Sequence, residues 1–201
     1  MAALRSDHYP LERRDVVRAL LEDRGDLLVV TGLGAPSWDA AAAGDADTTF
    51  ALWGAMGGAA MVGLGLALAQ PNRRVLVITG DGELLMGLGS LATVAVQRPA
   101  NLAIAVLDNE RYGETGQQET HTAHDVDLAG VALASGFAAA ESVAEPEHLA
   151  AALRRCREGE GPVMVVFKVR ADEPPLVMPP KDGVVLKSRF RRALLGPEAE
   201  A

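Results

Sequence analysis

The chain has 201 residues, of which 49% are hydrophobic, and a formal net charge of −8. This length can bury one sizeable core, so we expect a single domain, and the acidic balance without a basic stripe argues against nucleic acid as the main partner. The one cysteine, Cys156, excludes an internal disulfide, and the start of the chain lacks the apolar segment of a signal peptide, so we expect a cytoplasmic protein. Cys156 has no evident His or Asp partner beside it, so we expect a core or surface thiol, not a nucleophile.

Helical and strand-like patterns alternate along the chain. Helices are predicted at 11–24, 37–43, 57–69, 83–97, 127–135 and 146–158, and strands at 27–31, 48–52, 75–79, 102–107, 137–140 and 162–169. Such alternation predicts an α/β fold, an open parallel sheet with helices on both faces. After residue 170 the chain becomes rich in proline and charge. We therefore expect a domain of residues 1–170 and an extended tail, 171–201, with a short basic helix around 188–195.

Residues 50–70 form an uncharged run whose length alone would suit a membrane helix. The run contains several glycines, and its first part resembles strand and turn. A buried helix at 57–69, packed closely on a sheet, explains the small residues better, so we expect no membrane span.

The stretch 75–116 has the pattern of a βαβ unit with polar residues at two strand ends. Gly80-Asp81-Gly82 follows the first strand, and Asn109 follows the second. The carboxyl ends of parallel strands face one crevice, where helix N-termini also point, so a metal and an anion can meet there. Asp81 and Asn109 offer the hard oxygen ligands that Mg²⁺ prefers, and N–H groups near Gly82 could hold phosphate oxygens. A plain crossover with ordinary turn residues is the alternative.

Gly80-Asp81-Gly82, followed by a helix, a strand and Asn109, resembles the motif of the thiamine diphosphate-dependent enzymes. The resemblance implies that Asp81, Asn109 and the main-chain carbonyl of Arg111 hold the Mg²⁺ that anchors the cofactor diphosphate. It also implies that the cofactor contacts residues of this stretch. These are Gly80, Asp81, Gly82, Glu83, Leu84, Tyr112 and Gly113.

Two residues depart from the pattern of this family. Glu83 stands where relatives usually carry a small residue, and we expect its side chain to turn outward in the first helical turn, where carboxylates are favoured. Asp108 stands where many members have an asparagine, which retains a polar residue at the strand end.

Two glycine runs, 32–34 and 54–58, lie near predicted strand ends. Neither forms a dinucleotide fingerprint in a βαβ frame, which disfavours an NAD(P)-dependent oxidoreductase. In the thiamine diphosphate family, a bulky apolar residue upstream of the motif Asp wedges under the cofactor and forces it into a V shape. Met56 stands at the corresponding distance before Asp81, so we expect it to be this wedge, with an ordinary core methionine as the alternative.

Residues 110–125 are polar and glycine-rich, and we expect them to form an irregular loop on the ligand face. The resemblance narrows here to the small subunits of sulfopyruvate decarboxylase and the carboxyl-terminal part of phosphonopyruvate decarboxylase, and it covers most of residues 26–169. In those relatives this loop closes over the cofactor and helps to form the substrate pocket. The candidates for that role are Thr115, Gly116 and Gln117.

Two histidines of the same loop, His121 and His124, are further candidates for catalysis. Imidazole titrates near neutrality, so either side chain could move protons or contact a carboxylate. Their spacing could also suit a metal pair, yet no third ligand is apparent. Histidines exposed to solvent in a loop are the alternative.

The resemblance implies a decarboxylase of small 2-oxo acids that uses thiamine diphosphate and Mg²⁺. The cofactor also needs a pyrimidine domain with a catalytic Glu, and only about 50 residues precede Met56. We therefore expect a separate pyrimidine-domain subunit and a hetero-oligomer. A carboligase subunit and a non-catalytic nucleotide-binding scaffold are alternatives. Sulfonate or phosphonate substrates would need cations, for which Arg111 and Arg98 are the candidates.

Overall fold

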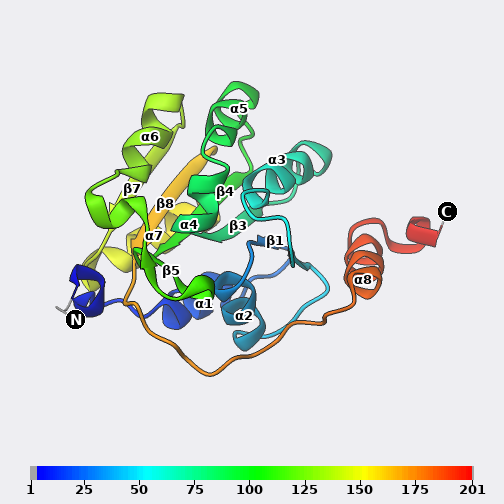
Figure 1. Ribbon diagram of the computed structural model, residues 1–201. Helices are drawn as coiled ribbons and strands as arrows, with labels where there is room; N and C mark the ends of the chain where they lie inside the picture. The colour runs from blue at the N-terminus through cyan, green and yellow to red at the C-terminus, as the bar shows by residue number, and fades with distance from the viewer. Residues whose placement is uncertain (1–3, 201) are drawn as a thin grey trace.

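The computed structural model describes residues 4–200, and its centre is one sheet of six strands in the order β2-β1-β3-β4-β8-β7 (Figure 1). Every neighbouring pair in this sheet is parallel. The strands are β1 (Leu28–Thr31), β2 (Thr49–Ala51), β3 (Val75–Gly80), β4 (Leu102–Asp108), β7 (Ala139–Val143) and β8 (Val163–Lys168).

Helices cover both faces of the sheet, which confirms the predicted architecture. One face carries α1 (Arg13–Leu21), α2 (Ala35–Ala42) and α7 (Pro146–Glu158), and the other carries α3 (Ala59–Ala69), α5 (Ser90–Gln97) and α6 (Leu128–Ser135). Alternate residues of the same strands serve the two cores: Val77 and Ile104 lie in one cluster, Leu76 and Ala105 in the other. This is why the central strands are almost continuous apolar runs.

The small residues of α3 allow the close packing on the sheet that the sequence predicts. A Cβ at Gly63 would clash with the side chain of Val77, so only glycine permits this approach. The opposite side of α3 exposes Met61, Val62 and Leu68. Within residues 4–200, no helix combines the length and the apolar character that a membrane span requires.

The prediction of a single helix at 83–97 is wrong. The structure has a short α4 (Asp81–Met86), which begins at the motif Asp, and a separate α5 after a turn at 87–89. Gly87 lies against the backbone of Gly57, and a Cβ at Gly87 would clash with the Gly57 carbonyl oxygen. A continuous helix would not allow this contact, so the chain turns here.

The loop at 110–125 is more regular than predicted. Two short strands, β5 (Arg111–Tyr112) and β6 (Gln118–Glu119), form an antiparallel pair. The turn between them contains 3-10 helix η2 (Gly113–Thr115) and two residues with positive φ, Gly116 and Gln117. A second 3-10 helix, η3 (His121–His124), follows. Glycine and the backbone pairing thus give this polar segment a defined path.

The C-terminal segment crosses the carboxyl edge of the sheet and ends in a helix beside β2 (Figure 1). This helix, α8 (Gly183–Leu195), begins earlier than predicted because Asp182 Oδ1 caps it, accepting hydrogen bonds from the N–H groups of Val184 and Val185 at 2.8 and 3.3 Å. Phe190 of α8 packs on Phe50 of β2 with ring centroids 5.3 Å apart. The first and last elements of the described residues are the 3-10 helices η1 (Arg5–His8) and η4 (Gly196–Glu200). The domain boundary at residue 170 stays a prediction.

Candidate functional site

A cavity of about 590 Å³ lies at the carboxyl edge of the sheet, where β3 and β4 end. Most of the residues predicted to bind the cofactor or the metal line this cavity, and so do two of the loop candidates. These lining residues are Met56, Gly80, Asp81, Gly82, Glu83, Asn109, Arg111, Tyr112, Gly113, Thr115 and Gln117. The fold therefore brings the two strand ends of the motif to one chamber, as expected for a parallel sheet.

Asp81 is the first residue of α4 and is almost completely buried. Its Oδ2 accepts a hydrogen bond from the hydroxyl group of Thr120 at 2.5 Å and lies 3.2 Å from the hydroxyl oxygen of Thr122. Burial, and then the carboxylate of Asp108 nearby, raise the pKa of Asp81 to about 7. A cation beside Asp81 would favour its ionised form, so the structure presents a carboxyl group suited to a metal.

Asn109 follows β4 and faces the same cavity as Asp81. Its side-chain Oδ1 accepts a hydrogen bond from the N–H of Arg111 at 3.0 Å, which fixes the amide and leaves one lone pair of that oxygen for a ligand. Within residues 4–200, no group of three or more His, Cys, Asp and Glu side chains could hold a metal ion. One carboxylate, one amide and a main-chain carbonyl fit Mg²⁺, which prefers hard oxygen ligands.

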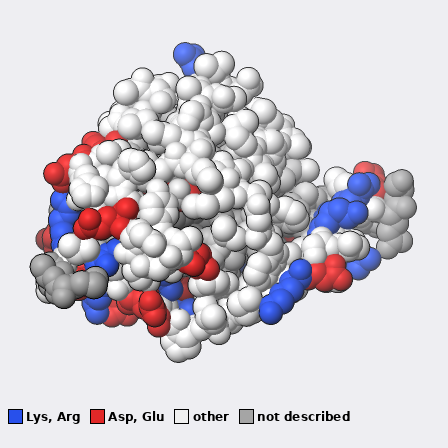
Figure 2. Space-filling model, viewed as in Figure 1, with Lys and Arg blue, Asp and Glu red and all other residues white. Residues whose placement is uncertain are grey.

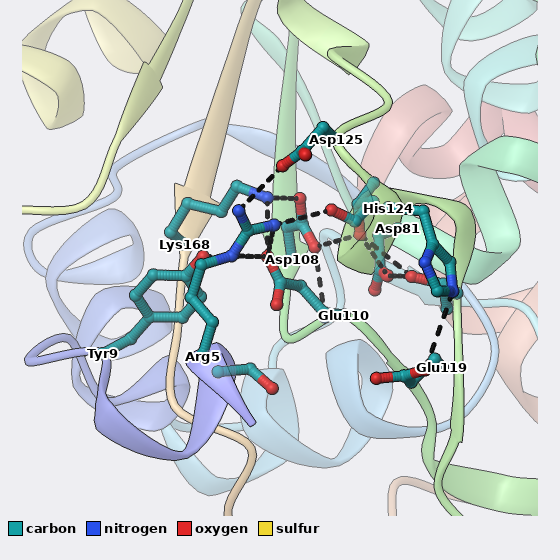
Figure 3. Close-up of polar contacts among 12 residues, drawn as sticks. Arg5, Tyr9, Asp81, Asp108, Glu110, Glu119, His124, Asp125 and Lys168 are labelled. Atoms are coloured by element: carbon teal, nitrogen blue, oxygen red, sulfur yellow. Dashed lines mark hydrogen bonds and ion pairs between the residues drawn. The ribbon is translucent and has the colours of Figure 1, made fainter. Parts of the chain in front are cut away.

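A chain of polar contacts leads from Asp81 to the other side of β4 (Figure 3). Thr122 Oγ1 donates to Asp108 Oδ1 at 2.7 Å, and Lys168 Nζ lies 2.7 Å from Asp108 Oδ2. Lys168 also lies 3.3 Å from Oε1 of Glu110. Asp108 therefore keeps the polar strand end that the sequence predicts, but it is paired with a lysine and lies behind the candidate metal ligand.

Glu110 is buried in the same network and anchors the N-terminal segment (Figure 3). Its Oε1 accepts hydrogen bonds from Arg5 at 2.7 Å and from the hydroxyl of Tyr9 at 2.8 Å. Burial alone would raise the pKa of Glu110, but the hydrogen bonds from Arg5 and Tyr9 lower it below its usual value. Sequence reasoning missed this network, because nothing in the local pattern pairs residues so far apart.

Glu83 turns inward, which corrects the expectation that it points to solvent. The side chain is buried, one carboxylate oxygen accepts a hydrogen bond from Thr79 Oγ1, and the other accepts one from the N–H of Ala59 at 3.2 Å. Burial raises the pKa of Glu83 to about 7, while the backbone N–H groups of Ala59 and Gly57 oppose this rise. Glu83 therefore lies in the first turn of α4, where a carboxylate is favoured, but it accepts its hydrogen bond from the first turn of α3.

Met56 lies in the loop before α3 and lines the cavity. With 38% of its surface exposed it is not an ordinary core methionine. Its role as the wedge stays a prediction. Leu84, another predicted contact, is buried in the core below the cavity and is absent from the cavity lining.

The structure does not bring His121 and His124 to the cavity. Both are exposed in η3, and neither lines the chamber. Nε2 of His124 lies 3.6 Å from Oε2 of Glu119 (Figure 3). Gly116 also lies outside the lining. The catalytic roles of the two histidines stay predictions, and the geometry gives them no support.

Of the two candidate cations, Arg98 ends α5 with φ of 48° and is absent from the cavity lining. The Arg111 guanidinium turns to Asp7, with Nη2 2.7 Å from Oδ1. Arg13 of α1, which was not predicted from the sequence, also lines the cavity. Its Nε lies 2.9 Å from Oδ2 of Asp39. The segment 172–176 also lines the cavity. Neither the amphipathic pattern around Arg13 nor the proline-rich composition of 172–176 indicates that these residues line a cavity.

Comparison with known proteins agrees with this geometry. Residues 39–167 match the family model described as "Thiamine pyrophosphate enzyme, C-terminal TPP binding domain". The chain is 45% identical over 127 residues to sulfopyruvate decarboxylase subunit beta of Methanothermobacter thermautotrophicus, covering 63% of this chain and 68% of that protein. It is 41% identical over 166 residues to phosphonopyruvate decarboxylase of Streptomyces viridochromogenes, covering 83% of this chain and 41% of that protein.

The solved structure of benzoylformate decarboxylase from Polynucleobacter necessarius has the same fold, with a TM-score of 0.67 and 21% identity. The match covers 88% of this chain but only 36% of that one, so the chain spans about a third of the larger protein. The family model covers more than half of the chain, and the motif residues Asp81 and Asn109 lie within the match. The chain therefore belongs to the thiamine pyrophosphate enzyme family, as a C-terminal TPP-binding domain.

Proposed function

We propose that the chain is the diphosphate-binding subunit of a decarboxylase of small 2-oxo acids that depends on thiamine diphosphate and Mg²⁺. The observation that carries this proposal is the meeting of Asp81, Asn109 and Arg111 in one cavity at the carboxyl edge of the sheet. The relatives named sulfopyruvate and phosphonopyruvate decarboxylase support the reaction class. When bound, the cofactor supplies the electron sink for the loss of CO₂ from a 2-oxo acid.

In this proposal, the residues of this chain bind and orient Mg²⁺ and the cofactor. The Asp81 carboxylate, the Asn109 amide oxygen and the Arg111 carbonyl would hold Mg²⁺, and N–H groups near Gly82 would hold the diphosphate. Met56 would support the bent cofactor from below. The loop after β5 and the segment 172–176 line the cavity, and they would help to shield a bound cofactor from water.

A partner subunit with a pyrimidine domain would supply the catalytic Glu and close the site. The face formed by α3, α4, α5 and α6 carries few charged side chains (Figure 2). It exposes large apolar residues: Met61, Val62, Leu68, Met86, Val96 and Leu133. Exposed apolar patches of this kind mark interaction surfaces. The Met56 loop leads directly into α3, so this face adjoins the cavity, and the partner would dock there.

The test is calorimetric titration of thiamine diphosphate with Mg²⁺ into the chain, alone and with a pyrimidine-domain subunit. We expect binding and turnover of 2-oxo acids only when both proteins are present. Asp81→Ala should abolish binding that depends on Mg²⁺ without loss of fold, because it removes a metal ligand. Asp26→Ala removes the same charge at an exposed site and should bind like the wild type.

Three outcomes would contradict the proposal. Turnover by the purified chain alone would exclude the shared site. Unchanged cofactor binding by Asp81→Ala would exclude the metal assignment. Binding of ADP as strong as that of thiamine diphosphate would favour a nucleotide-binding scaffold. Product analysis separates the two enzyme classes, because a carboligase would join two oxo compounds and a decarboxylase would release an aldehyde.

A further inference from the structure

Helix α3 begins without a capping residue of its own. Gly58 is its N-cap and makes no side-chain capping bond, and residues 57–60 are Gly-Gly-Ala-Ala. The first N–H groups of a helix have no acceptor within the helix, and Ser, Thr, Asp or Asn at the N-cap normally satisfies one of them. At the start of α3, a group from elsewhere in the chain has to do so.

Glu83 supplies that group from α4. One oxygen of its buried carboxylate accepts a hydrogen bond from the N–H of Ala59 at 3.2 Å, and the backbone N–H of Gly57 also favours the ionised carboxylate, which lowers its pKa. The other oxygen accepts a hydrogen bond from Thr79 at the end of β3. The carboxylate also lies against Gly32 at the end of β1, where a Cβ would clash with it. One side chain therefore joins β1, β3 and the start of α3.

These contacts connect Met56 to Asp81. Met56 directly precedes Gly57, whose φ of +84° turns the chain and whose carbonyl packs against Gly87 just beyond α4. The Met56 loop is therefore attached to α4 at two points, the Glu83 carboxylate and the Gly57–Gly87 contact. Asp81 is the first residue of the same helix. The expected wedge and the expected metal ligand thus belong to one packed unit.

We propose that Glu83 is a positioning residue, whose carboxylate holds the N–H groups of Gly57 and Ala59 and thereby fixes Met56 relative to Asp81 before the cofactor binds. The inference rests on the proposed roles of Met56 and Asp81. The competing explanation is electrostatic: a carboxylate near the diphosphate site would weaken cofactor binding.

Two neutral variants separate these explanations. Glu83→Gln keeps an acceptor oxygen at the same reach, whereas Glu83→Ser is too short to reach the N–H groups of Gly57 and Ala59. Both variants remove the charge. Glu160→Gln, at an exposed residue outside the cavity lining, is the matched control for the change of charge.

The first measurement is amide hydrogen exchange of the peptide 54–60 in the full chain. We expect Glu83→Ser to speed exchange at the N–H groups of Gly57 and Ala59 by about tenfold or more, because they lose their acceptor. Glu83→Gln and Glu160→Gln should exchange like the wild type. This readout needs no cofactor, so it tests the link even if the proposed function fails.

The second measurement is the Kd of thiamine diphosphate with Mg²⁺ for the complex with the partner. We expect Glu83→Ser to raise the Kd about tenfold and Glu83→Gln to raise it less than threefold, since ordering the loop must then accompany binding. Unchanged exchange in Glu83→Ser, equal behaviour of Ser and Gln, or tighter binding by Glu83→Ser would overturn the proposal. If the wild-type complex binds no thiamine diphosphate, the proposed function fails instead.

Discussion

Asp81 must satisfy two opposing conditions at the scale of a single residue. Burial and the neighbouring Asp108 favour its protonated form, with a pKa of about 7. The Mg²⁺ proposed to bind Asp81 requires the ionised form. The hydroxyl group of Thr120 partly reconciles the two, because it donates to the carboxylate and orients it.

This balance predicts that cofactor binding depends on pH. The proposed binding of Mg²⁺ to Asp81 must release its proton, and a group of pKa about 7 is roughly tenfold more ionised at pH 8 than at pH 6. The affinity for thiamine diphosphate with Mg²⁺ should therefore rise about tenfold from pH 6 to pH 8, as measured by calorimetry. The Glu83→Gln variant, which removes the carboxyl group whose pKa is also raised to about 7, should keep this dependence. A flat profile would contradict the assignment.

At the scale of elements, the turn between α4 and α5 is set by one close contact. Gly87 approaches the Gly57 backbone so closely that a Cβ would displace the Met56 loop, whereas a Cβ at Gly89 would meet nothing within 4 Å. The two glycines are two residues apart in one turn, so an alanine at Gly89 is a matched control for an alanine at Gly87.

Gly87→Ala should destabilise the chain by about 1–3 kcal/mol and weaken cofactor binding, because the backbone must shift. Gly89→Ala should change stability by less than about 1 kcal/mol, since its backbone is compatible with alanine. Urea unfolding of both variants and titration of the cofactor into their complexes measure these effects. Equal effects of the two substitutions would refute the role of the contact.

The helices and strands could be predicted from the sequence better than the contacts between them. The strands and most helices were predictable because apolar runs and helical periodicity are local, and the motif placed Asp81 and Asn109 at the carboxyl edge. Cys156 is fully buried, as a core thiol, and burial raises its pKa to about 12. The inward turn of Glu83 was not predictable, because its acceptor role depends on an uncapped helix from another part of the chain. The pairing of Thr120 and Thr122 with Asp81 is equally nonlocal.

At the scale of the whole molecule, charge is distributed unevenly. The face over α3, α4, α5 and α6 carries few charged side chains, although the chain as a whole has a formal net charge of −8 (Figure 2). An apolar surface of this kind beside the cavity suits the docking of the proposed partner subunit.

Charge introduced on this face should prevent assembly and leave the fold intact. Met61→Glu and Met86→Glu should each weaken binding of the pyrimidine-domain subunit about tenfold or more, while the unfolding free energy of the isolated chain changes by less than about 1 kcal/mol. Val184→Glu alters an exposed apolar residue of α8, outside this face, and should bind normally. Analytical ultracentrifugation of the mixtures measures the affinity. Normal assembly of the Met variants would place the partner elsewhere.

The segment 172–176 follows the last strand of the sheet, yet it forms part of the cavity wall together with Arg13 of α1. The proposed metal ligands, Asp81 and Asn109, stand instead at the ends of the central strands β3 and β4. Detaching this segment would therefore open the cavity on one side and leave the proposed ligands in place.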